Sequence, residues 1–530
     1  MYNGAILIGA SEAHAADTFH ATNPATGETG DVAFANAGPA DVAKATALAA
    51  AAFETFSTTT LEARATFIET VAANILALKD DLVATAMAET ALPKPRLEGE
   101  TGRTVGQLRM FAAEVRQGLW LDATIDPAMP DRAPLPRADL RRVNVALGPV
   151  AVFGASNFPL AFSVAGGDTA AAFAAGCPVV VKGHAAHPGT GELVARAIQQ
   201  AVASCGLPEG VFSYLPGTTN ELGGALVADP IIKAVGFTGS RGGGLALMKI
   251  AAQRAEPIPV YAEMSSINPV VLLPGALAAR AEAMGPAFVG SLTMGAGQFC
   301  TNPGLVIAID GPDLDTFVAS AAKALTAAQP AVMLTPGIHA SYERGVDELA
   351  SHEAVTTVAR GCVGDGVNQA VGALFTTDAT KFASDAALSH EVFGSSSILV
   401  RCKDIAEVKA VITQLEGQLT ATIQSGEGDE AAAGELLPAL QAKVGSILFN
   451  GWPTGVEVSH AMVHGGPVPA TSDGRSTSVG TLAMARFLRP VCYQDTPDAL
   501  LPPALQAANP WNIARRTNGV LELAQAGQDK

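Results

Sequence analysis

The chain has 530 residues, of which 48% are hydrophobic and 16% are charged, and its formal net charge is −17. This length exceeds what one hydrophobic core normally supports, so we expect a globular protein with more than one domain. The acidic balance argues against a protein that binds nucleic acid through a broad basic surface, although it allows a local cationic pocket.

No apolar run reaches the roughly 18 to 20 residues that a membrane span needs, and the first residues lack the basic start of a secretory signal. We therefore expect a cytoplasmic protein with no membrane segment. The six cysteines are scattered without the spacing of a disulfide framework or a structural zinc site. A cysteine in this chain is thus expected to be either a buried apolar side chain or a nucleophile.

The first half of the chain changes its pattern twice. Residues 39 to 117 carry apolar side chains at spacings of three and four, which predicts a series of helices. Residues 120 to 147 are rich in proline and alternate in charge. Such a segment is typical of an extended excursion, and we expect it to pair with another subunit or to cover a sheet edge.

From Leu147 onward, short Val/Ile-rich runs bounded by glycine and proline alternate with helical runs. This alternation predicts an α/β fold with right-handed βαβ units and a parallel sheet, an architecture that often binds nucleotides. A second α/β section continues to about residue 450. The segment after about residue 490 is rich in proline and asparagine, and we expect it to lie on a surface.

A glycine-rich segment, GFTGSRGGG at residues 236 to 244, follows a β-rich run and precedes a helical run. Such a turn lets backbone N–H groups approach a pyrophosphate, but the spacing is not GxGxxG, and a tight packing turn is the alternative. Lys182 ends another strand run, where open α/β sheets present groups to ligands. It is either a donor to ribose hydroxyls or a solvated loop lysine.

Three more residues could carry chemistry. Glu263 follows an apolar run and is a candidate general base, with a capping or ion-paired glutamate as the alternative. Asn157, in FGASNFPL, could donate to a developing oxyanion or serve turn chemistry. Cys300, in TMGAGQFCTNPG, stands between two turns, and we expect Gly297 and Gly304 to permit close backbone turns around its thiol.

Together these motifs form an ordered set: NPATGE near the start, then SNFP, VKGH, FTGS, a glutamate, GQFC and EVFG. This order resembles that of the aldehyde dehydrogenase superfamily over nearly the whole chain. The resemblance implies an aldehyde dehydrogenase fold with a Rossmann-like cofactor domain, an α/β catalytic domain and a small β-flap for oligomerisation. The implied ranges are 1–123 and 147–261 for the cofactor domain, 262–483 for the catalytic domain, 124–146 and 484–499 for the flap, and 500–530 for a C-terminal surface tail.

The resemblance also implies roles for the candidate residues. Cys300 corresponds to the nucleophile that forms a thiohemiacetal and then a thioester with the aldehyde. Asn157 and the Cys300 backbone N–H correspond to the donors that hold the oxyanion, and Glu263 to the base that activates water. No metal is implied. The implied partners are a small aldehyde and further copies of the chain, as a homodimer or a dimer of dimers.

The cofactor residues follow from the same motifs. By this resemblance, the residues expected to contact the cofactor are Lys182, Gly239, Ser240, Gly244, Glu391 and Phe393. Many NAD-preferring relatives carry a glutamate three residues after the lysine, where this chain has Ala185. Loss of that carboxylate permits NADP, with NAD as a second cofactor, and His184 or Arg241 is expected to contact the 2′-phosphate.

Residues 464–480 depart from the family's usual Gly-Gly-x-Lys-x-Ser-Gly segment. They resemble a branch that includes α-ketoglutaric semialdehyde (2,5-dioxopentanoate) dehydrogenases and an NADP-dependent fatty aldehyde dehydrogenase. The branch implies oxidation of the semialdehyde to 2-oxoglutarate, with a medium or long aldehyde as the alternative. An acyl-transferring relative that uses coenzyme A is disfavoured because Glu263 is present. The intact set of candidate catalytic residues also disfavours a silent homologue.

Arg103 bears on the choice of substrate. The resemblance places it on a helix that lines the substrate funnel, where its guanidinium suits a distal carboxylate. The alternative is a surface pair with Glu98 or Glu100. Phe158 and Phe299 flank Asn157 and Cys300 in the sequence, and we expect them to shape the aldehyde slot.

Overall fold

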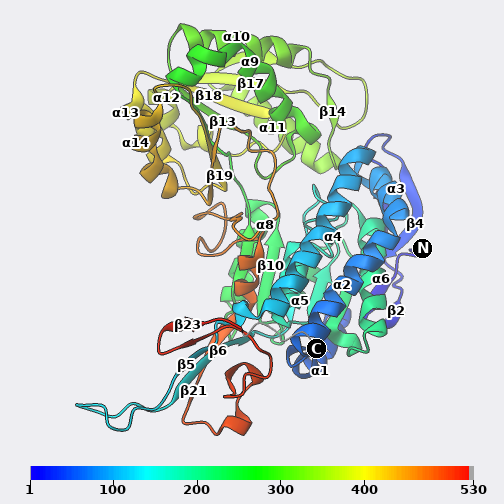
Figure 1. Ribbon diagram of the computed structural model, residues 1–530. Coiled ribbons are helices and arrows are strands. Elements are labelled where there is room, and N and C mark those ends of the chain that lie inside the picture. Colours follow the sequence, from blue (N-terminus) through cyan, green and yellow to red (C-terminus); the bar gives the residue numbers. More distant parts are fainter. Residues whose placement is uncertain (1, 525–530) are drawn as a thin grey trace.

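The computed structural model describes residues 2–524 (Figure 1). Two seven-stranded sheets form the body of the molecule, and a five-stranded sheet lies at one end. The predicted helices of residues 39 to 117 are confirmed. They are α1 Pro39–Ser57, α2 Leu61–Ala77, α3 Lys79–Thr90 and α4 Lys94–Gln117, followed by the short 3-10 turn η1 Leu119–Leu121.

The first sheet has the strand order β11-β10-β7-β8-β9-β1-β2. Its five strands from β11 to β9 are parallel, as the alternating pattern predicts. Two antiparallel N-terminal strands, which the sequence analysis did not predict, extend the β9 edge. The strands are β1 Ile6–Ile8, β2 Ser11–Ala13, β7 Val150–Phe153, β8 Val179–Lys182, β9 Phe212–Leu215, β10 Ala234–Thr238 and β11 Val260–Glu263.

Helices cover both faces of this sheet. Alternate residues of β7 point to opposite sides: Val150 and Val152 join one apolar core, and Ala151 and Phe153 join another. Helices α2, α4, α5 and α6 contribute to the first core and α1, α7 and α8 to the second. The remaining helices here are α5 Gly167–Ala175, α6 Pro188–Ser204, α7 Asn220–Ala228, α8 Arg241–Ala252 and the 3-10 turn η2 Glu209–Val211.

The second sheet has the order β15-β17-β18-β13-β12-β19-β20 and is parallel except for its edge strand β15. Helices cover both of its faces too. The strands are β12 Val270–Leu272, β13 Leu305–Ile309, β15 Thr356–Arg360, β17 Ala373–Asp378, β18 Ser396–Cys402, β19 Thr420–Gln424 and β20 Ser446–Phe449. The helices are α9 Pro274–Thr293, α10 Pro312–Thr326, α11 Pro336–Ser351, α12 Ala379–Ser384, α13 Ile405–Gln414 and α14 Glu430–Gln441, with 3-10 turns η3 Met294–Gly297 and η4 Ala386–Ser389.

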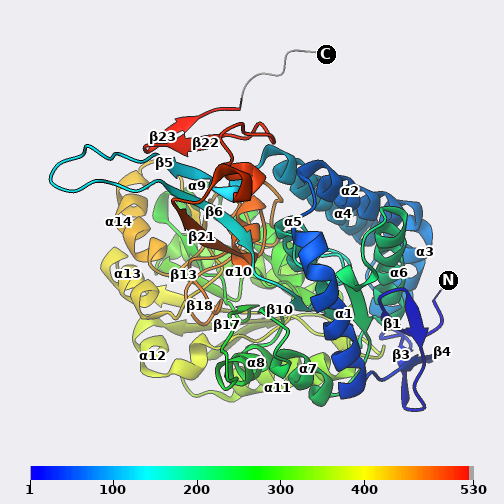
Figure 2. The ribbon, with the colours of Figure 1, turned by 90° about the horizontal axis from the view of Figure 1, so that it is seen from below.

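The third sheet, which we call the flap sheet, has the order β21-β6-β5-β22-β23. The loop between β5 and β6 projects away from the body in both views (Figures 1 and 2). The strands are β5 Thr124–Asp126, β6 Leu140–Ala146, β21 Leu488–Gln494, β22 Arg515–Thr517 and β23 Val520–Glu522. Two antiparallel pairs complete the strands: the hairpin of β3 Thr18–Thr22 with β4 Thr29–Ala35, and the two-stranded sheet of β14 Ala331–Val332 with β16 Gln369–Ala370.

The C-terminal segment differs from its prediction as a surface tail. It forms the two strands β22 and β23, and β22 pairs in parallel with β5. Leu501, Leu505 and Ile513 of this segment are buried in the same core as α2 and α4. The last six residues of the predicted tail, and Met1, lie outside the described residues. Short 3-10 turns precede the strands: η5 Thr481–Phe487, η6 Asp498–Leu500 and η7 Pro503–Leu505.

Among the helices of residues 2–524, none is both long enough and apolar enough to cross a membrane.

The fold gathers the ends of the parallel strands at one edge of the first sheet. Lys182 ends β8, Glu263 ends β11, and Gly239 directly follows β10. The carboxyl ends of parallel strands form the crevice in which open α/β sheets bind ligands. Residues 464–480 return across this edge, where the Met264 N–H donates to the carbonyl of Ala470 at 2.8 Å.

Gly297 and Gly304 differ in their need for glycine. Gly297 has φ +68°, and a Cβ there would overlap the Gly394 carbonyl group. Gly304 has no positive φ, and a Cβ would reach the Ile267 carbonyl oxygen only at 3.4 Å. The expectation that glycine permits a close turn therefore fits Gly297, whereas the conformation of Gly304 is open to other residues.

We expect Gly297→Ala to destabilise the protein by about 1 to 3 kcal/mol and so to lower its thermal unfolding midpoint. The reason is that it adds a Cβ to a residue with left-handed backbone, against the fixed backbone of Gly394. The matched control is Gly290→Ala in α9, where a Cβ meets nothing within 4 Å and helix propensity favours alanine by up to about 1 kcal/mol. Differential scanning calorimetry of both variants checks this. A Gly297→Ala protein as stable as Gly290→Ala would contradict it.

Candidate active site

A cavity of about 810 Å³ lies where the two large sheets meet. One wall comes from the strand ends of the first sheet and the other from loops of the second. Ten of the predicted site residues line it: Asn157, Phe158, His184, Gly239, Ser240, Arg241, Glu263, Cys300, Glu391 and Phe393. The cavity thus joins the predicted catalytic and cofactor residues in one space.

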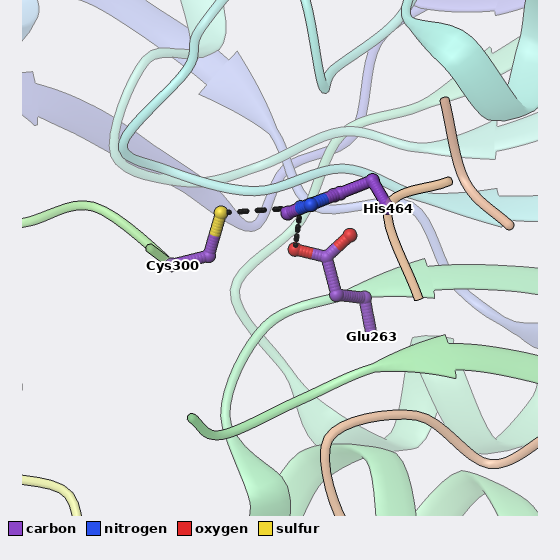
Figure 3. Close-up of side chains that lie close together, drawn as sticks. All are labelled: Glu263, Cys300 and His464. Carbon is purple, nitrogen blue, oxygen red and sulfur yellow. Dashed lines mark hydrogen bonds and ion pairs between the residues drawn. The ribbon is translucent and has the colours of Figure 1, made fainter. Parts of the chain in front are cut away.

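Cys300 lies in the loop after η3, and its side chain is partly exposed. Its Sγ lies 3.4 Å from Nε2 of His464 (Figure 3). Burial raises the pKa of the Cys300 thiol well above its usual value, and the nearby Glu263 carboxylate raises it further. The thiol is therefore protonated near neutral pH and needs a base before it can act as a nucleophile.

Glu263 is a buried carboxylate with two side-chain partners. Its Oε1 lies 2.9 Å from His464 Nε2, and its Oε2 accepts a hydrogen bond of 2.7 Å from the Ser478 hydroxyl. Burial would raise the pKa of Glu263, but the opposing effects of His464 and Ser478 prevail and the pKa is lowered. The carboxylate is thus ionised and can accept a proton.

His464 is a site residue that the sequence analysis missed. Its ring is buried and lies between the Cys300 thiol and the Glu263 carboxylate (Figure 3). Its backbone N–H donates to Thr477 Oγ1 at 2.8 Å, which fixes the residue within the segment 464–480. The one available signal was that this segment departs from the family pattern and begins with a histidine.

Asn157 directs its side chain toward the cysteine loop. Its Nδ2 donates to the Gln298 carbonyl at 2.9 Å, and its second N–H has no partner within the described chain. Its own carbonyl accepts a hydrogen bond of 3.1 Å from Arg96 Nη2. The amide is therefore held beside Cys300 with one donor free.

Arg96 of α4 was also missed by the sequence analysis. Its guanidinium lies 4.4 Å from the ring centre of Phe158 and 4.8 Å from that of Phe299. It also pairs with Glu100 at 3.3 Å. Arg96 therefore holds the two phenylalanines of the predicted aldehyde slot in a fixed position.

Arg103 lies seven residues after Arg96 on α4, about two helical turns further along. Its guanidinium stacks 4.9 Å from the ring centre of Phe162, and its Nη2 donates to the Val456 carbonyl at 3.3 Å. Its Nη1 is buried and has no hydrogen-bond partner within residues 2–524. Burial lowers the pKa of Arg103, while the negative charges of Glu100 and Glu263 oppose that shift. The guanidinium therefore lies within electrostatic range of the Glu263 carboxylate.

The alternative surface pairs of Arg103 do not form. Glu98 pairs with Lys79 at 3.8 Å, and Glu100 pairs with Arg96. Glu100 also accepts the Leu160 N–H at 2.9 Å, so its carboxylate is already engaged. Arg103 keeps a buried N–H without an acceptor, which is costly unless a ligand supplies one.

Lys182 has no side-chain hydrogen bond or ion pair within the described residues. Burial lowers the pKa of Lys182 to about 8. His184 lies nearby, stacked on His187 with ring centres 5.2 Å apart. Its Nδ1 accepts the Ala186 N–H at 3.1 Å, so a neutral His184 carries its proton on Nε2. Burial, with the charges of His187 and Lys182, lowers the pKa of His184 well below its usual value, which keeps the ring neutral.

The glycine-rich turn begins α8. Ser240 caps this helix, its Oγ accepting the Gly243 N–H at 3.2 Å. At Gly244 a Cβ would lie 2.7 Å from the Met264 sulfur, so glycine allows the helix to approach β11. The Gly239 N–H donates to the Glu263 carbonyl at 3.1 Å. Arg241 is paired with Glu416 at 2.8 Å.

Glu391 and Phe393 enter the cavity from the second sheet. Glu391 accepts one backbone hydrogen bond, from the Ser266 N–H at 3.4 Å, and burial raises its pKa to about 8. Glu391 thus brings an under-bonded carboxyl to the cavity beside the N-terminus of α8, and Lys182, whose ammonium has no partner within the described residues, ends β8 two residues before the cavity-lining His184. This donor and acceptor set fits a dinucleotide with ribose hydroxyls and a diphosphate.

Comparisons with known proteins agree with this geometry. A sequence model described as the aldehyde dehydrogenase family matches residues 11–478. The chain is 58% identical over 521 residues to alpha-ketoglutaric semialdehyde dehydrogenase 2 of Azospirillum brasilense, across 98% of this chain and 99% of that protein. It is 50% identical over 482 residues to the alpha-ketoglutaric semialdehyde dehydrogenase of Acinetobacter baylyi, across 91% of each.

Solved structures share the fold. A mutant of aldehyde dehydrogenase C from Pseudomonas syringae, solved with NAD⁺ and octanal, superposes with a TM-score of 0.79 at 21% identity, over 93% of this chain and 97% of that one. A mutant aldehyde dehydrogenase from Bacillus cereus gives a TM-score of 0.80 at 21% identity, over 93% and 96%. The expected α/β fold is confirmed.

The environment of Cys300 predicts its reactivity. Iodoacetamide should modify Cys300 slowly near pH 7, and the rate should rise by roughly tenfold per pH unit because only the thiolate reacts. Glu263→Gln removes a negative charge that raises the thiol pKa, so alkylation at fixed pH should be faster in that variant. Mass spectrometry locates the modification, with Cys300→Ala as the blank. Slower alkylation in Glu263→Gln than in the wild type would contradict this electrostatic account.

Proposed function

The chain belongs to the aldehyde dehydrogenase family, and we propose that it oxidises α-ketoglutaric semialdehyde to 2-oxoglutarate with NADP. The observation that carries the substrate assignment is the buried, unpaired Nη1 of Arg103 beside the Cys300 site. A distal carboxylate would satisfy this donor through a charge-assisted hydrogen bond. The names of the two most similar relatives described above support the same substrate.

In the proposed mechanism, Glu263 accepts the thiol proton of Cys300, and the thiolate attacks the aldehyde carbon. The free N–H of Asn157 and the backbone N–H of Cys300 donate to the resulting oxyanion. A nicotinamide bound at the cofactor residues would supply the hydride acceptor that turns the thiohemiacetal on Cys300 into a thioester. After Glu263 has passed the thiol proton to solvent, it takes a proton from the water that attacks this thioester; the carbon–sulfur bond then breaks, the acid leaves and Cys300 is released.

His464 serves in this mechanism as a positioning residue. It holds Glu263 Oε1 while Ser478 holds Oε2, which keeps the carboxylate ionised and directed at the thiol. Since Ser478 helps to lower the pKa of Glu263, Ser478→Ala should move the acid limb of the pH–rate profile to higher pH. If the acid limb stays at the same pH in Ser478→Ala, then Ser478 does not act by lowering the pKa of Glu263.

The charges of the proposed cofactor-binding residues favour NADP over NAD. A 2′-phosphate would meet the Lys182 ammonium and the Nε2–H of His184, and Ala185 leaves room where a glutamate would repel it. Glu391, Phe393, Gly239, Ser240 and Gly244 would hold the rest of the cofactor. Arg241 already pairs with Glu416, so its part in phosphate binding requires that this pair open.

The three larger sheets support a division into domains, although β22 and β23 of the flap sheet lie outside the flap ranges. We assign residues 1–123 and 147–261 to cofactor binding, 262–483 to catalysis, and 124–146 and 484–499 to the flap. The projecting loop of the flap carries Met129 and Leu135, which are 44% and 69% exposed. Self-association through this flap as a homodimer or a dimer of dimers would cover them, and light scattering in solution measures the state.

The substrate assignment predicts a selective defect. Arg103→Ala should lower kcat/KM for α-ketoglutaric semialdehyde by about 100-fold, because it removes the charged partner of the carboxylate. The kcat/KM for pentanal, a neutral aldehyde of the same length, should change by less than about threefold. The control is Arg109→Ala, an exposed arginine on the same helix, with Cys300→Ala as the assay blank. An unchanged ratio of the two efficiencies would exclude the carboxylate role.

The cofactor assignment predicts a second selective defect. Ala185→Glu should lower kcat/KM with NADP by roughly 10- to 100-fold, since a carboxylate repels the 2′-phosphate, and should leave NAD activity nearly unchanged. Ala185→Gln has the same size without the charge, so it separates repulsion from crowding. Steady-state kinetics at saturating aldehyde measures both. Equal losses with NAD and NADP would contradict the assignment, as would a wild-type enzyme that strongly prefers NAD.

A further inference from the structure

Glu263, Cys300 and His464 do more than form a proton-transfer site. One carboxylate oxygen, the thiol sulfur and one imidazole nitrogen all lie within 4.8 Å of one another. The three side chains come from β11, the cysteine loop and the segment 464–480, and they converge on one point (Figure 3). Among residues 2–524 no other group of three such side chains comes as close together.

The distances match a metal site. Zinc binds thiolate at about 2.3 Å and imidazole or carboxylate at about 2.0 to 2.2 Å in a tetrahedral arrangement, which places neighbouring ligand atoms roughly 3.3 to 3.6 Å apart. In the structure, Cys300 Sγ lies 3.4 Å from His464 Nε2, which in turn lies 2.9 Å from Glu263 Oε1. Small side-chain rotations would therefore seat the ion.

The surroundings also suit zinc. A thiolate and a carboxylate bring two negative charges against the two positive charges of the ion. Ser478 donates to the outer oxygen of Glu263 at 2.7 Å, an outer hydrogen bond of the kind that orients metal ligands. Cys300 and Glu263 line the large cavity, so an ion can reach them from it. Arg103 is the nearby charge that opposes a cation.

We propose that Glu263, Cys300 and His464 bind one Zn²⁺ reversibly and that this ion blocks the nucleophile. As the sulfur–zinc bond forms, the thiol proton passes to solvent, and nothing is oxidised or reduced. Water or a solvent anion takes the fourth position. Bound zinc would thus inhibit the enzyme, and removal of the ion by a chelator would restore its activity.

Cobalt and zinc binding test this directly, without substrate or cofactor. The reduced protein should bind one Zn²⁺ per chain in equilibrium dialysis, and Co²⁺ should give the near-ultraviolet charge-transfer band of a cobalt–thiolate bond. Cys300→Ala should lose that band, and His464→Gln should bind at least about 10- to 100-fold more weakly. The control is His460→Gln, which removes an exposed imidazole four residues earlier and should bind as the wild type does.

A second measurement needs no variant, so it holds even where a substitution disturbs folding. Stoichiometric Zn²⁺ should protect Cys300 of the wild-type protein from iodoacetamide, and EDTA should restore the labelling; Cys492, which is exposed, should label at the same rate throughout. Unprotected Cys300, or equal affinity of wild type and His464→Gln, would overturn the proposal. Because neither readout uses turnover, failure here is distinct from failure of the proposed function.

Discussion

The active site depends on one constraint: the end of β11 must be covered by residues 464–480. The Glu263 backbone bridges to Thr471, and the Ser472 N–H donates to the Ala262 carbonyl at 2.9 Å. This covering removes Glu263 from water and at the same time supplies His464 and Ser478, which keep the buried carboxylate ionised. Without those partners, burial alone would favour the protonated acid, and Glu263 could not serve as the proposed base.

Other buried polar groups of the site lack such partners. The Nη1 of Arg103 and the ammonium of Lys182 have no acceptor among the described residues, and Glu391 has a single long hydrogen bond. Burial of polar groups without partners costs free energy. The proposed cofactor and the carboxylate of the proposed substrate would supply these partners, so the new hydrogen bonds would contribute to the free energy of binding.

Helix α4 connects the substrate side to the cysteine loop. Arg96 holds Phe158 and Phe299 and bonds the Asn157 carbonyl, while Glu100 accepts the N–H groups of Leu160 and Ala161. One helix face therefore fixes both the pair of phenylalanines and the loop that carries Asn157, the proposed oxyanion donor. The arrangement gives precision at the reacting atoms because it is built on a rigid element rather than on loops alone.

The sequence by itself determined the features that are local or ordered along the chain. Periodicity predicted the helices of residues 39 to 117 and the parallel strands after Leu147, and the order of short motifs identified the family with Cys300, Glu263 and Lys182. Only the tertiary structure decided what depends on residues distant in the chain. His464 meets Glu263 across 201 positions, Arg96 meets the Asn157 carbonyl across 61, and β22 pairs with β5 through Arg516 and Thr124. Such contacts leave no period in the sequence, because they are set by how separate elements pack.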